Sequence, residues 1–273
     1  MPSSNDRDYV LGTHDEEIAR LGLQHSVWRP RALAAWQRAG FNVGQTIVDV
    51  GCGPGYATLD LAELVGATGH VVAIDRSRRF LDALDARRRA RGIEHITAIE
   101  SDLDDVAFDA STADGAWCRW VLAFVPRPRD LLTRIARALK PGGTFVSHEY
   151  FDYASWRAVP RSELFEAFVT DVIANWRRSG GEPDIGLEVP RWLEELGFEV
   201  ESVEPVIHVI TPRDYMWQWP ASFMQIGLDR LIDTGAVTPE RGEVLRAALT
   251  EVAASSTSRM ITPGVLEVIA RKR

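Results

Sequence analysis

Cysteine is scarce in this chain of 273 residues, which contains only Cys52 and Cys118. These two lie far apart in the sequence, so their spacing suggests neither a disulfide framework nor a metal site. No stretch approaches the ~18 consecutive apolar residues of a membrane span. Residues 1–8 are polar and lack the apolar core of a secretion signal. We therefore expect a mobile start to the chain and a cytoplasmic protein with no membrane span and no bound metal.

Basic residues are also in short supply, with 31 bases against 39 acids and a formal net charge of −8. Affinity for nucleic acid rests on clustered lysine and arginine, so this balance argues against a nucleic-acid partner. The hydrophobic fraction of 45% and the charged fraction of 26% are ordinary for a soluble globular protein. The length predicts one large domain, or one domain with an inserted cap.

Glycine is concentrated in the stretch from Thr46 to Tyr56, which runs TIVDVGCGPGY. A β-branched run ends in an acid and a glycine-dense turn, and apolar residues at 57, 61 and 64 then follow at helical spacing. The pattern predicts a strand, a tight loop and a helix, whose first N–H groups are free to bind a ligand. The dinucleotide fingerprint G-x-G-x-x-G is not met, because Tyr56 stands where the third glycine belongs.

The glycines follow the pattern G-x-G-x-G instead, and Asp49 precedes Gly51 by two residues. The string Asp-Val-Gly-Cys-Gly-Pro-Gly resembles motif I of class I methyltransferases that use S-adenosyl-L-methionine (SAM). The resemblance covers about residues 8–148 and is to small-molecule enzymes of the ubiquinone and menaquinone biosynthesis type. It implies that Asp49, Gly51 and Gly53 bind SAM, which methyl transfer would convert into S-adenosyl-L-homocysteine (SAH).

Two further acids follow predicted strands. Asp75 ends the apolar run from Val71, and an acid about 20 residues past such a loop is placed to accept hydrogen bonds from ribose hydroxyls. The resemblance implies the same role and places Arg76 beside it, whereas a helix N-cap is the structural alternative. Asp102 and Leu103 follow a strand at 96–100, where the resemblance implies contact with adenine and an Asx turn is the alternative.

Residues on both sides of this core resemble parts of the same enzymes. Arg119 and Trp120 end a strand at 114–120 and are expected near the methionine end of SAM, although Arg119 could equally form a salt bridge. Tyr9 and Gln24 are expected to touch the methionine carboxylate, or else to be a packing anchor and a solvated residue. Thr13 has the form of an N-cap, and Pro30 predicts the start of a second helix.

Together, these patterns and the resemblance predict an α/β fold. The expected core is a Rossmann-like class I methyltransferase sheet, mostly parallel with an antiparallel last strand at 265–270, and it carries helical cap insertions. Residues 1–45 would be N-terminal helices that close over the cofactor, and 46–150 the SAM-binding core. Residues 151–273 would hold the remaining strands, including one at 198–210, with aromatic-rich helical insertions at about 151–180 and 212–256.

The resemblance implies methyl transfer to O, N or C of a small aromatic or apolar acceptor by in-line displacement, which needs positioning more than acid or base. His148 is the candidate catalytic base, ahead of Glu149, His25 and His208, and a structural histidine is the alternative. Four other functions stay open: SAM use without methyl transfer, SAM binding without catalysis, RNA or protein methylation, and NAD-dependent oxidation. Residues 212–228 could line a pocket or form a homodimer surface.

Overall fold

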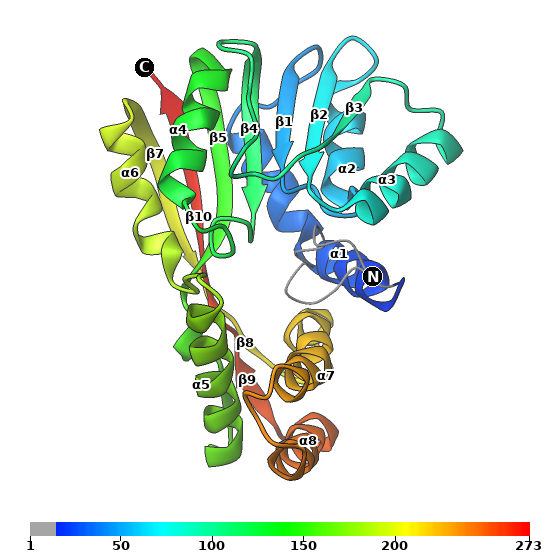
Figure 1. Ribbon diagram of the computed structural model, residues 1–273, viewed down its shortest axis with the longest axis vertical. Helices are drawn as coiled ribbons and strands as arrows, with labels where there is room; N and C mark the ends of the chain where they lie inside the picture. The colour runs from blue at the N-terminus through cyan, green and yellow to red at the C-terminus, as the bar shows by residue number, and fades with distance from the viewer. Residues whose placement is uncertain (1–14) are drawn as a thin grey trace, which may run out of the picture.

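The chain folds around one seven-stranded sheet, whose strands lie side by side in Figure 1. The structure is a computed structural model, and it describes residues 15–273. In spatial order the strands are β3 (Ile96–Glu100), β2 (His70–Asp75), β1 (Thr46–Val50), β4 (Ala113–Arg119), β5 (Leu139–Asp152), β10 (Gly264–Lys272) and β7 (Phe198–Val206). Strands β1 to β5 pair in parallel, whereas β10 lies between β5 and β7 and is antiparallel to both.

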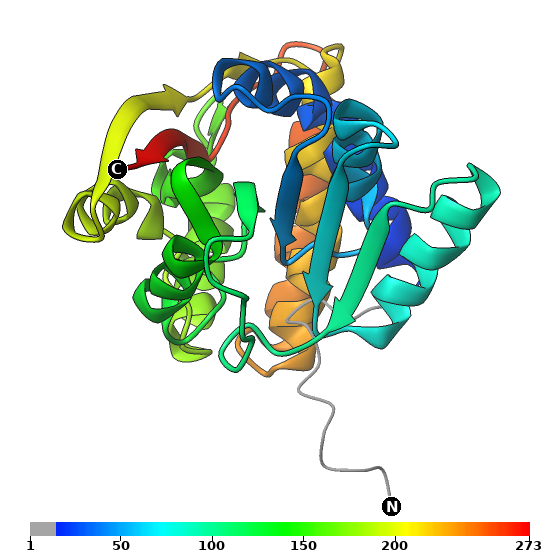
Figure 2. The ribbon, with the colours of Figure 1, turned by 90° about the horizontal axis from the view of Figure 1, so that it is seen from above.

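Helices cover both faces of this sheet, as the view from above shows (Figure 2). One face is covered by α1 (Asp15–Arg38), α2 (Tyr56–Val65) and α3 (Arg78–Ala90), and the other by α4 (Pro128–Ala138) and α6 (Val189–Glu195). Strands that are buried on both faces need apolar side chains in both directions, which explains the continuous apolar runs of β1 and β2. Within residues 15–273, no helix combines the length and apolar character needed to cross a bilayer.

A smaller unit, which we call the cap, lies beyond the carboxyl ends of the parallel strands (Figure 1). It consists of α5 (Glu163–Arg178), α7 (Gln218–Asp233), α8 (Pro239–Ala254) and a sheet of β6 (Arg157–Val159), β9 (Arg259–Ile261) and β8 (Val209–Ile210). Single 3₁₀ turns at η1 (Tyr153–Ser155) and η2 (Ile185–Leu187) lie between the two units, and η3 (Tyr215–Trp217) precedes α7 within the cap. The predicted α/β fold, with its mostly parallel sheet and antiparallel last strand, is confirmed.

The prediction that two helices precede the first strand is wrong, because α1 continues through Pro30. A proline inside a helix costs about 3 kcal/mol through a lost hydrogen bond and a steric clash. Trp28 and Trp36 lie on either side of it, and both are fully buried. Burial of two such side chains, at about 1.5–3 kcal/mol or more each, outweighs that cost. Thr13, the predicted N-cap of the first helix, lies outside the described residues.

Two further boundaries differ from the prediction. The strand predicted at 198–210 is two strands, because the chain leaves the main sheet after Val206 and β8 joins the cap sheet. At the break, the N–H of His208 donates to Thr262 Oγ1 at 3.0 Å. The aromatic stretch from residue 151 is not helical at first, since β5 extends to Asp152 and α5 begins only after the N-cap Ser162.

A buried carboxylate fastens α1 to the sheet. Glu267 on β10 is fully buried and accepts hydrogen bonds from Arg31 Nε at 2.7 Å and from His148 Nε2 at 2.8 Å, and Arg38 is a third partner. Burial alone would raise the pKa of Glu267, but the hydrogen bonds from His148 and Arg31 outweigh it and bring the pKa to about 2. One ionised side chain thus ties the N-terminal helix to the last strand.

We expect Glu267→Gln to destabilise the fold by about 3 kcal/mol near neutral pH, because removing one member of a buried ion pair leaves its partners uncompensated. Urea unfolding is the measurement. The matched control is Glu201→Gln, which removes a partly exposed partner of Arg271 and should cost less than about 1 kcal/mol.

The same variant has a defined pH dependence. A carboxyl whose folded pKa lies near 2, below the ordinary 4.5, stabilises the fold above pH 4.5 and loses that contribution as the pH falls. The difference in unfolding free energy between wild type and Glu267→Gln should therefore become smaller as the pH falls from 4.5 to about 2. A gap that stays constant down to the lower value would contradict the assignment.

Candidate functional site

The larger of two adjoining cavities opens at the carboxyl ends of β1, β2 and β4 and has an empty volume of about 1270 Å³, its open mouth included. Open α/β sheets bind ligands at this edge. Nine of the ten residues predicted from the sequence to contact the cofactor line this cavity: Gln24, Asp49, Gly51, Gly53, Asp75, Arg76, Asp102, Leu103 and Arg119. The tenth, Tyr9, lies outside the described residues. We call this cavity the cofactor cavity.

The glycine turn has the backbone that its sequence suggests. Gly51, Gly53 and Gly55 have φ of 66°, 53° and 82°, a region that side chains with a Cβ rarely adopt. A Cβ on Gly51 would lie 2.4 Å from Val121 Cγ2, whereas one on Gly53 would meet no atom within 4 Å. Gly51 is thus required by packing, and Gly53 by its backbone shape beside the open cavity.

Asp75 holds this turn in place. One carboxylate oxygen accepts the N–H of Gly53 at 2.8 Å, and the other accepts the N–H of Ser77 at 2.8 Å. Burial raises the pKa of Asp75, although these two N–H groups oppose the shift. A carboxylate oxygen accepts more than one hydrogen bond, so Asp75 can fix the loop and still bind ligand hydroxyls.

Asp49 lies beneath the same turn and is almost fully buried. It accepts a hydrogen bond from Thr58 Oγ1 at 2.6 Å, which joins β1 to α2. Burial raises the pKa of Asp49 to about 6. Its side chain lies at the floor of the cavity and contributes negative charge there.

Asp102 and Leu103 follow β3 at the far side of the cavity. The exposed carboxylate of Asp102 accepts the N–H of Asp104 at 2.9 Å, so the Asx-type turn is present, and the side chain also lines the cavity. Leu103 is buried, and its carbonyl accepts a hydrogen bond from Arg134 at 2.5 Å. The structural alternative and the ligand-binding prediction are therefore compatible at this position.

Arg119 ends β4 and joins a chain of buried polar groups. Its Nη2 donates to His25 Nδ1 at 3.0 Å, and the other ring nitrogen of His25 lies 3.0 Å from Asp60 Oδ2. A guanidinium can only donate, so Nδ1 accepts and the ring proton of His25 sits on Nε2, facing Asp60. Burial lowers the pKa of His25, which agrees with a neutral ring. Asp60 also accepts from Arg29 at 2.7 Å.

The second guanidinium nitrogen of Arg119, Nη1, is buried and has no hydrogen-bond partner among residues 15–273. Burial lowers the pKa of Arg119 to about 10, which leaves it charged at neutral pH. Within residues 15–273, Arg119 forms no salt bridge, so the structure gives no support to the salt-bridge alternative. A buried cation at the cavity wall is suited to binding a ligand's carboxylate.

The loop after β4 is shaped by Glu149, which the sequence suggested only as a further candidate base. Glu149 is buried and accepts the N–H groups of Val121 at 2.8 Å, Leu122 at 2.9 Å and Ala123 at 3.4 Å. Trp120, the residue before them, has φ of 52°, which is unusual for a bulky side chain. The glutamate thus holds the loop while Trp120 is turned toward the cavities.

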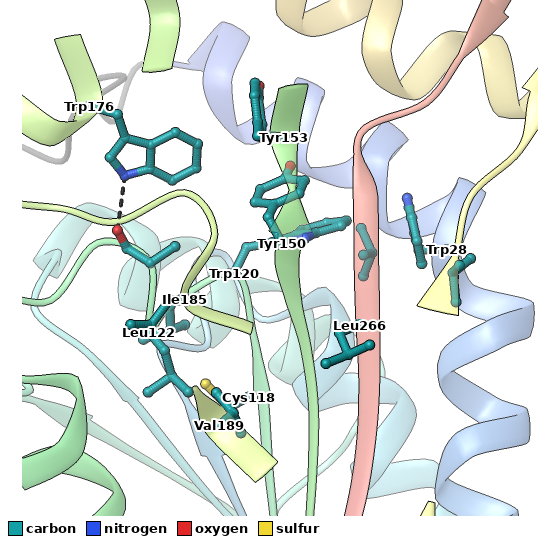
Figure 3. Packing of buried hydrophobic residues seen from close by; sticks show 14 of the residues in the cluster. Trp28, Cys118, Trp120, Leu122, Tyr150, Tyr153, Trp176, Ile185, Val189 and Leu266 are labelled. Carbon is teal, nitrogen blue, oxygen red and sulfur yellow. Dashed lines mark hydrogen bonds between the residues drawn. The ribbon is translucent and has the colours of Figure 1, made fainter. Parts of the chain in front are cut away.

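Trp120, Gln24 and Phe124 line both cavities, so the two adjoin at these side chains. The second cavity has an empty volume of about 790 Å³ and lies between α1, the end of β5, α5 and α7; we call it the acceptor cavity. The Trp120 ring stacks against Tyr150 and Trp219, with centroids 5.5 and 5.6 Å apart. Figure 3 shows Trp120 and Tyr150 in this arrangement, with Trp176 donating to a backbone oxygen.

His148, the predicted catalytic base, lies elsewhere. It is fully buried, bonds Glu267 and packs against Trp28 and Trp117 at centroid distances of 5.6 and 4.9 Å. It lines neither cavity, and burial lowers its pKa. The expectation that its side chain faces the substrate is therefore wrong, and its position supports the structural alternative.

Known proteins resemble this chain in sequence and in fold. Residues 47–143 match the family described as a methyltransferase domain, a segment that runs from β1 into β5 and contains the glycine turn. With the sheet topology, this match confirms the predicted resemblance to class I SAM-dependent methyltransferases over this segment of the chain. The demethylmenaquinone methyltransferase of Lactococcus lactis is 31% identical over 126 residues, 46% of this chain and 49% of that enzyme.

The chain spans about half the length of the curated relatives that it matches first. Among solved structures, a candidate methyltransferase from Bacillus halodurans has a TM-score of 0.60 at 19% identity, covering 88% of this chain and 97% of that one. Geranyl diphosphate C-methyltransferase from Streptomyces coelicolor, solved with SAH among its ligands, has a TM-score of 0.53 at 16% identity and covers 91% and 80%. At these identities the likeness establishes the fold.

We expect Arg119→Gln to weaken SAH binding by about tenfold to a hundredfold, because a hydrogen bond to a charged group contributes about 1.5–3 kcal/mol. Methylthioadenosine shares the adenosyl group and the thioether but has no carboxylate, so it should bind wild type and variant equally. Calorimetric titration measures both affinities.

The control is Arg127→Gln, which removes an exposed guanidinium that lies outside the cavity lining. It should leave both affinities unchanged. Equal losses for SAH and methylthioadenosine in Arg119→Gln would show that Arg119 supports the loop and does not bind the carboxylate.

Proposed function

We propose that this chain transfers the methyl group of SAM to O, N or C of a small aromatic or apolar molecule bound in the acceptor cavity. The observation that carries the proposal is the adjoining of two cavities at Trp120. One is lined by the residues expected to bind the cofactor, and the other is lined mainly by aromatic rings. Apolar pockets with a few polar groups are typical of sites for small molecules.

The cofactor cavity accounts for each part of SAM. The backbone of the glycine turn allows the ligand to come close, and the first N–H groups of α2 face it. Asp75 binds the ribose hydroxyls, and Asp102 with Leu103 contacts adenine. Arg119 binds the methionine carboxylate, and the neutral His25 keeps its guanidinium oriented. Gln24, whose Oε1 accepts from Arg20 at 2.7 Å, lies at the entrance to the acceptor cavity, near the reacting end.

The reaction is a displacement at carbon. SAM would supply the methyl group: the acceptor atom would bond to the methyl carbon, and the pair of the broken carbon–sulfur bond would stay on sulfur to give neutral SAH. A proton carried by the acceptor atom would be released to water. Among the described residues lining the acceptor cavity, none is a histidine, aspartate or glutamate that would serve as a base. The rate enhancement then comes mainly from holding the acceptor in line with the methyl group, which can lower the barrier by about 7–11 kcal/mol.

Three finer points belong to the same proposal. The acidic balance, at a net charge of −8, supports a protein without a nucleic-acid partner, and the cytoplasmic location stays a prediction. A homodimer stays a prediction for residues 212–228. Tyr215 in this segment is 59% exposed, whereas Trp217 and Trp219 are buried, so its aromatic residues mainly form the interior of the cap.

Acceptor-dependent release of SAH tests the proposal. Purified protein is incubated with SAM and a panel of small aromatic acceptors, and SAH and the methylated acceptor are quantified by mass spectrometry. We expect equal amounts of the two products with at least one acceptor and no SAH without one. Conversion of an acceptor without SAH release would show that the chain uses SAM for a reaction other than methyl transfer.

A further inference from the structure

The charged side chains in the described wall of the acceptor cavity are all positive. Two arginines, Arg20 and Arg230, lie in its wall, and among the described residues that line it there is no carboxylate. The charge of Arg20 is already offset, since its Nε and Nη2 donate to the buried Glu17 at 2.7 and 2.6 Å. The surplus charge in the wall is therefore that of Arg230.

Arg230 lies on α7 and lines only the acceptor cavity. Its Nε is buried and has no hydrogen-bond partner within residues 15–273. Neighbouring arginines of the cap do have partners: Arg241 bonds Asp171 at 2.9 Å, and Arg246 bonds Asp229 at 2.6 Å. An unpaired donor on a guanidinium costs free energy, so its retention beside a cavity points to a ligand that pairs with it.

Apart from the two arginines, Gln24 and Asn175, the wall is apolar, and part of it is flat. Trp120, Tyr150 and Trp219 form a stack whose planes lie within 17° of one another, and Trp176 packs edge-on against Tyr150. A planar ring fits beside such a stack. Aromatic walls also bind cations, but next to an uncompensated guanidinium a positive ligand would be repelled.

We propose that the methyl acceptor is an aromatic molecule bearing a carboxylate, which binds Arg230 while the ring lies against the Trp120, Tyr150 and Trp219 stack. This inference rests on the proposed function and names its acceptor class. Trp120 borders the cofactor cavity and Arg230 does not, so the carboxylate end is directed away from the methyl group. The charged end thus orients the acceptor, and the reacting atom lies at the other end of the ring.

Three probes with the same ring system test the charge preference: naphthoate, naphthylmethanol and naphthylmethylamine. Each is titrated calorimetrically into the full chain saturated with SAH. We expect naphthoate to bind wild type at least about tenfold more tightly than the neutral alcohol, and the amine to bind most weakly, because a charge-assisted hydrogen bond contributes about 1.5–3 kcal/mol.

Arg230→Gln should remove the preference for naphthoate while leaving the affinity for the alcohol unchanged. Arg230→Lys keeps the charge and should retain part of the preference. The control Arg246→Gln removes a paired arginine on the cap surface and should behave as wild type. SAH titrations of all four proteins report whether the cofactor cavity is intact.

Each outcome has a separate meaning. If wild type binds SAH but binds the alcohol or the amine as tightly as naphthoate, or binds no naphthoate at millimolar concentration, the acceptor class is wrong and the proposed methyl transfer stands. An unchanged preference in Arg230→Gln would also overturn the role of Arg230. If wild type fails to bind SAH, the proposed function itself fails.

Discussion

The site depends on one buried carboxylate, that of Glu149. By accepting three consecutive backbone N–H groups, it fixes the loop after β4 in a shape that turns Trp120 into the left-handed backbone region. Burial raises the pKa of Glu149 to about 7, although the three N–H groups oppose that shift. Such a group is costly to bury, and its retention is understandable because the position of Trp120, between the two cavities, depends on it.

Helix α1 connects this loop to the rest of the molecule. Through Arg31 it is fastened to Glu267 on β10, and through His25 it reaches Arg119 at the end of β4. Trp28 on the same helix packs edge-on against Trp120, with ring centroids 5.2 Å apart. The helix therefore supports the end of β4 and the loop after it, and these contacts help to offset the cost of Pro30 within it.

The sequence was informative where local chemistry determines structure. The glycine turn and the acids Asp75 and Asp102 follow from residue types at fixed spacing, and the structure gathers these residues in one cavity. The antiparallel last strand was implied by the resemblance to class I methyltransferases and is confirmed. It was not informative where distant residues decide. His148 was expected at the cavity, but it bonds Glu267, which lies 119 residues further along the chain. No local pattern predicts that partner.

Tertiary contacts also explain the other differences. The left-handed backbone of Trp120, and the Arg230 Nε that has no partner among residues 15–273, arise from packing between elements far apart in the sequence. Neither is visible in a window of neighbouring residues. The abundance of aromatic residues after residue 150 did indicate a cap with a pocket. It could not indicate that one guanidinium in the wall would have no carboxylate partner in the described part of the chain.

The central claim is that the glycine turn and Asp75 bind the adenosyl group of SAM. The most direct measurement is calorimetric titration of the purified protein with SAH and, separately, with NAD⁺, repeated for Asp75→Ala. The account predicts micromolar binding of SAH that is lost or strongly weakened in the variant, and no binding of NAD⁺. Binding of NAD⁺ alone, or of neither ligand, would contradict it.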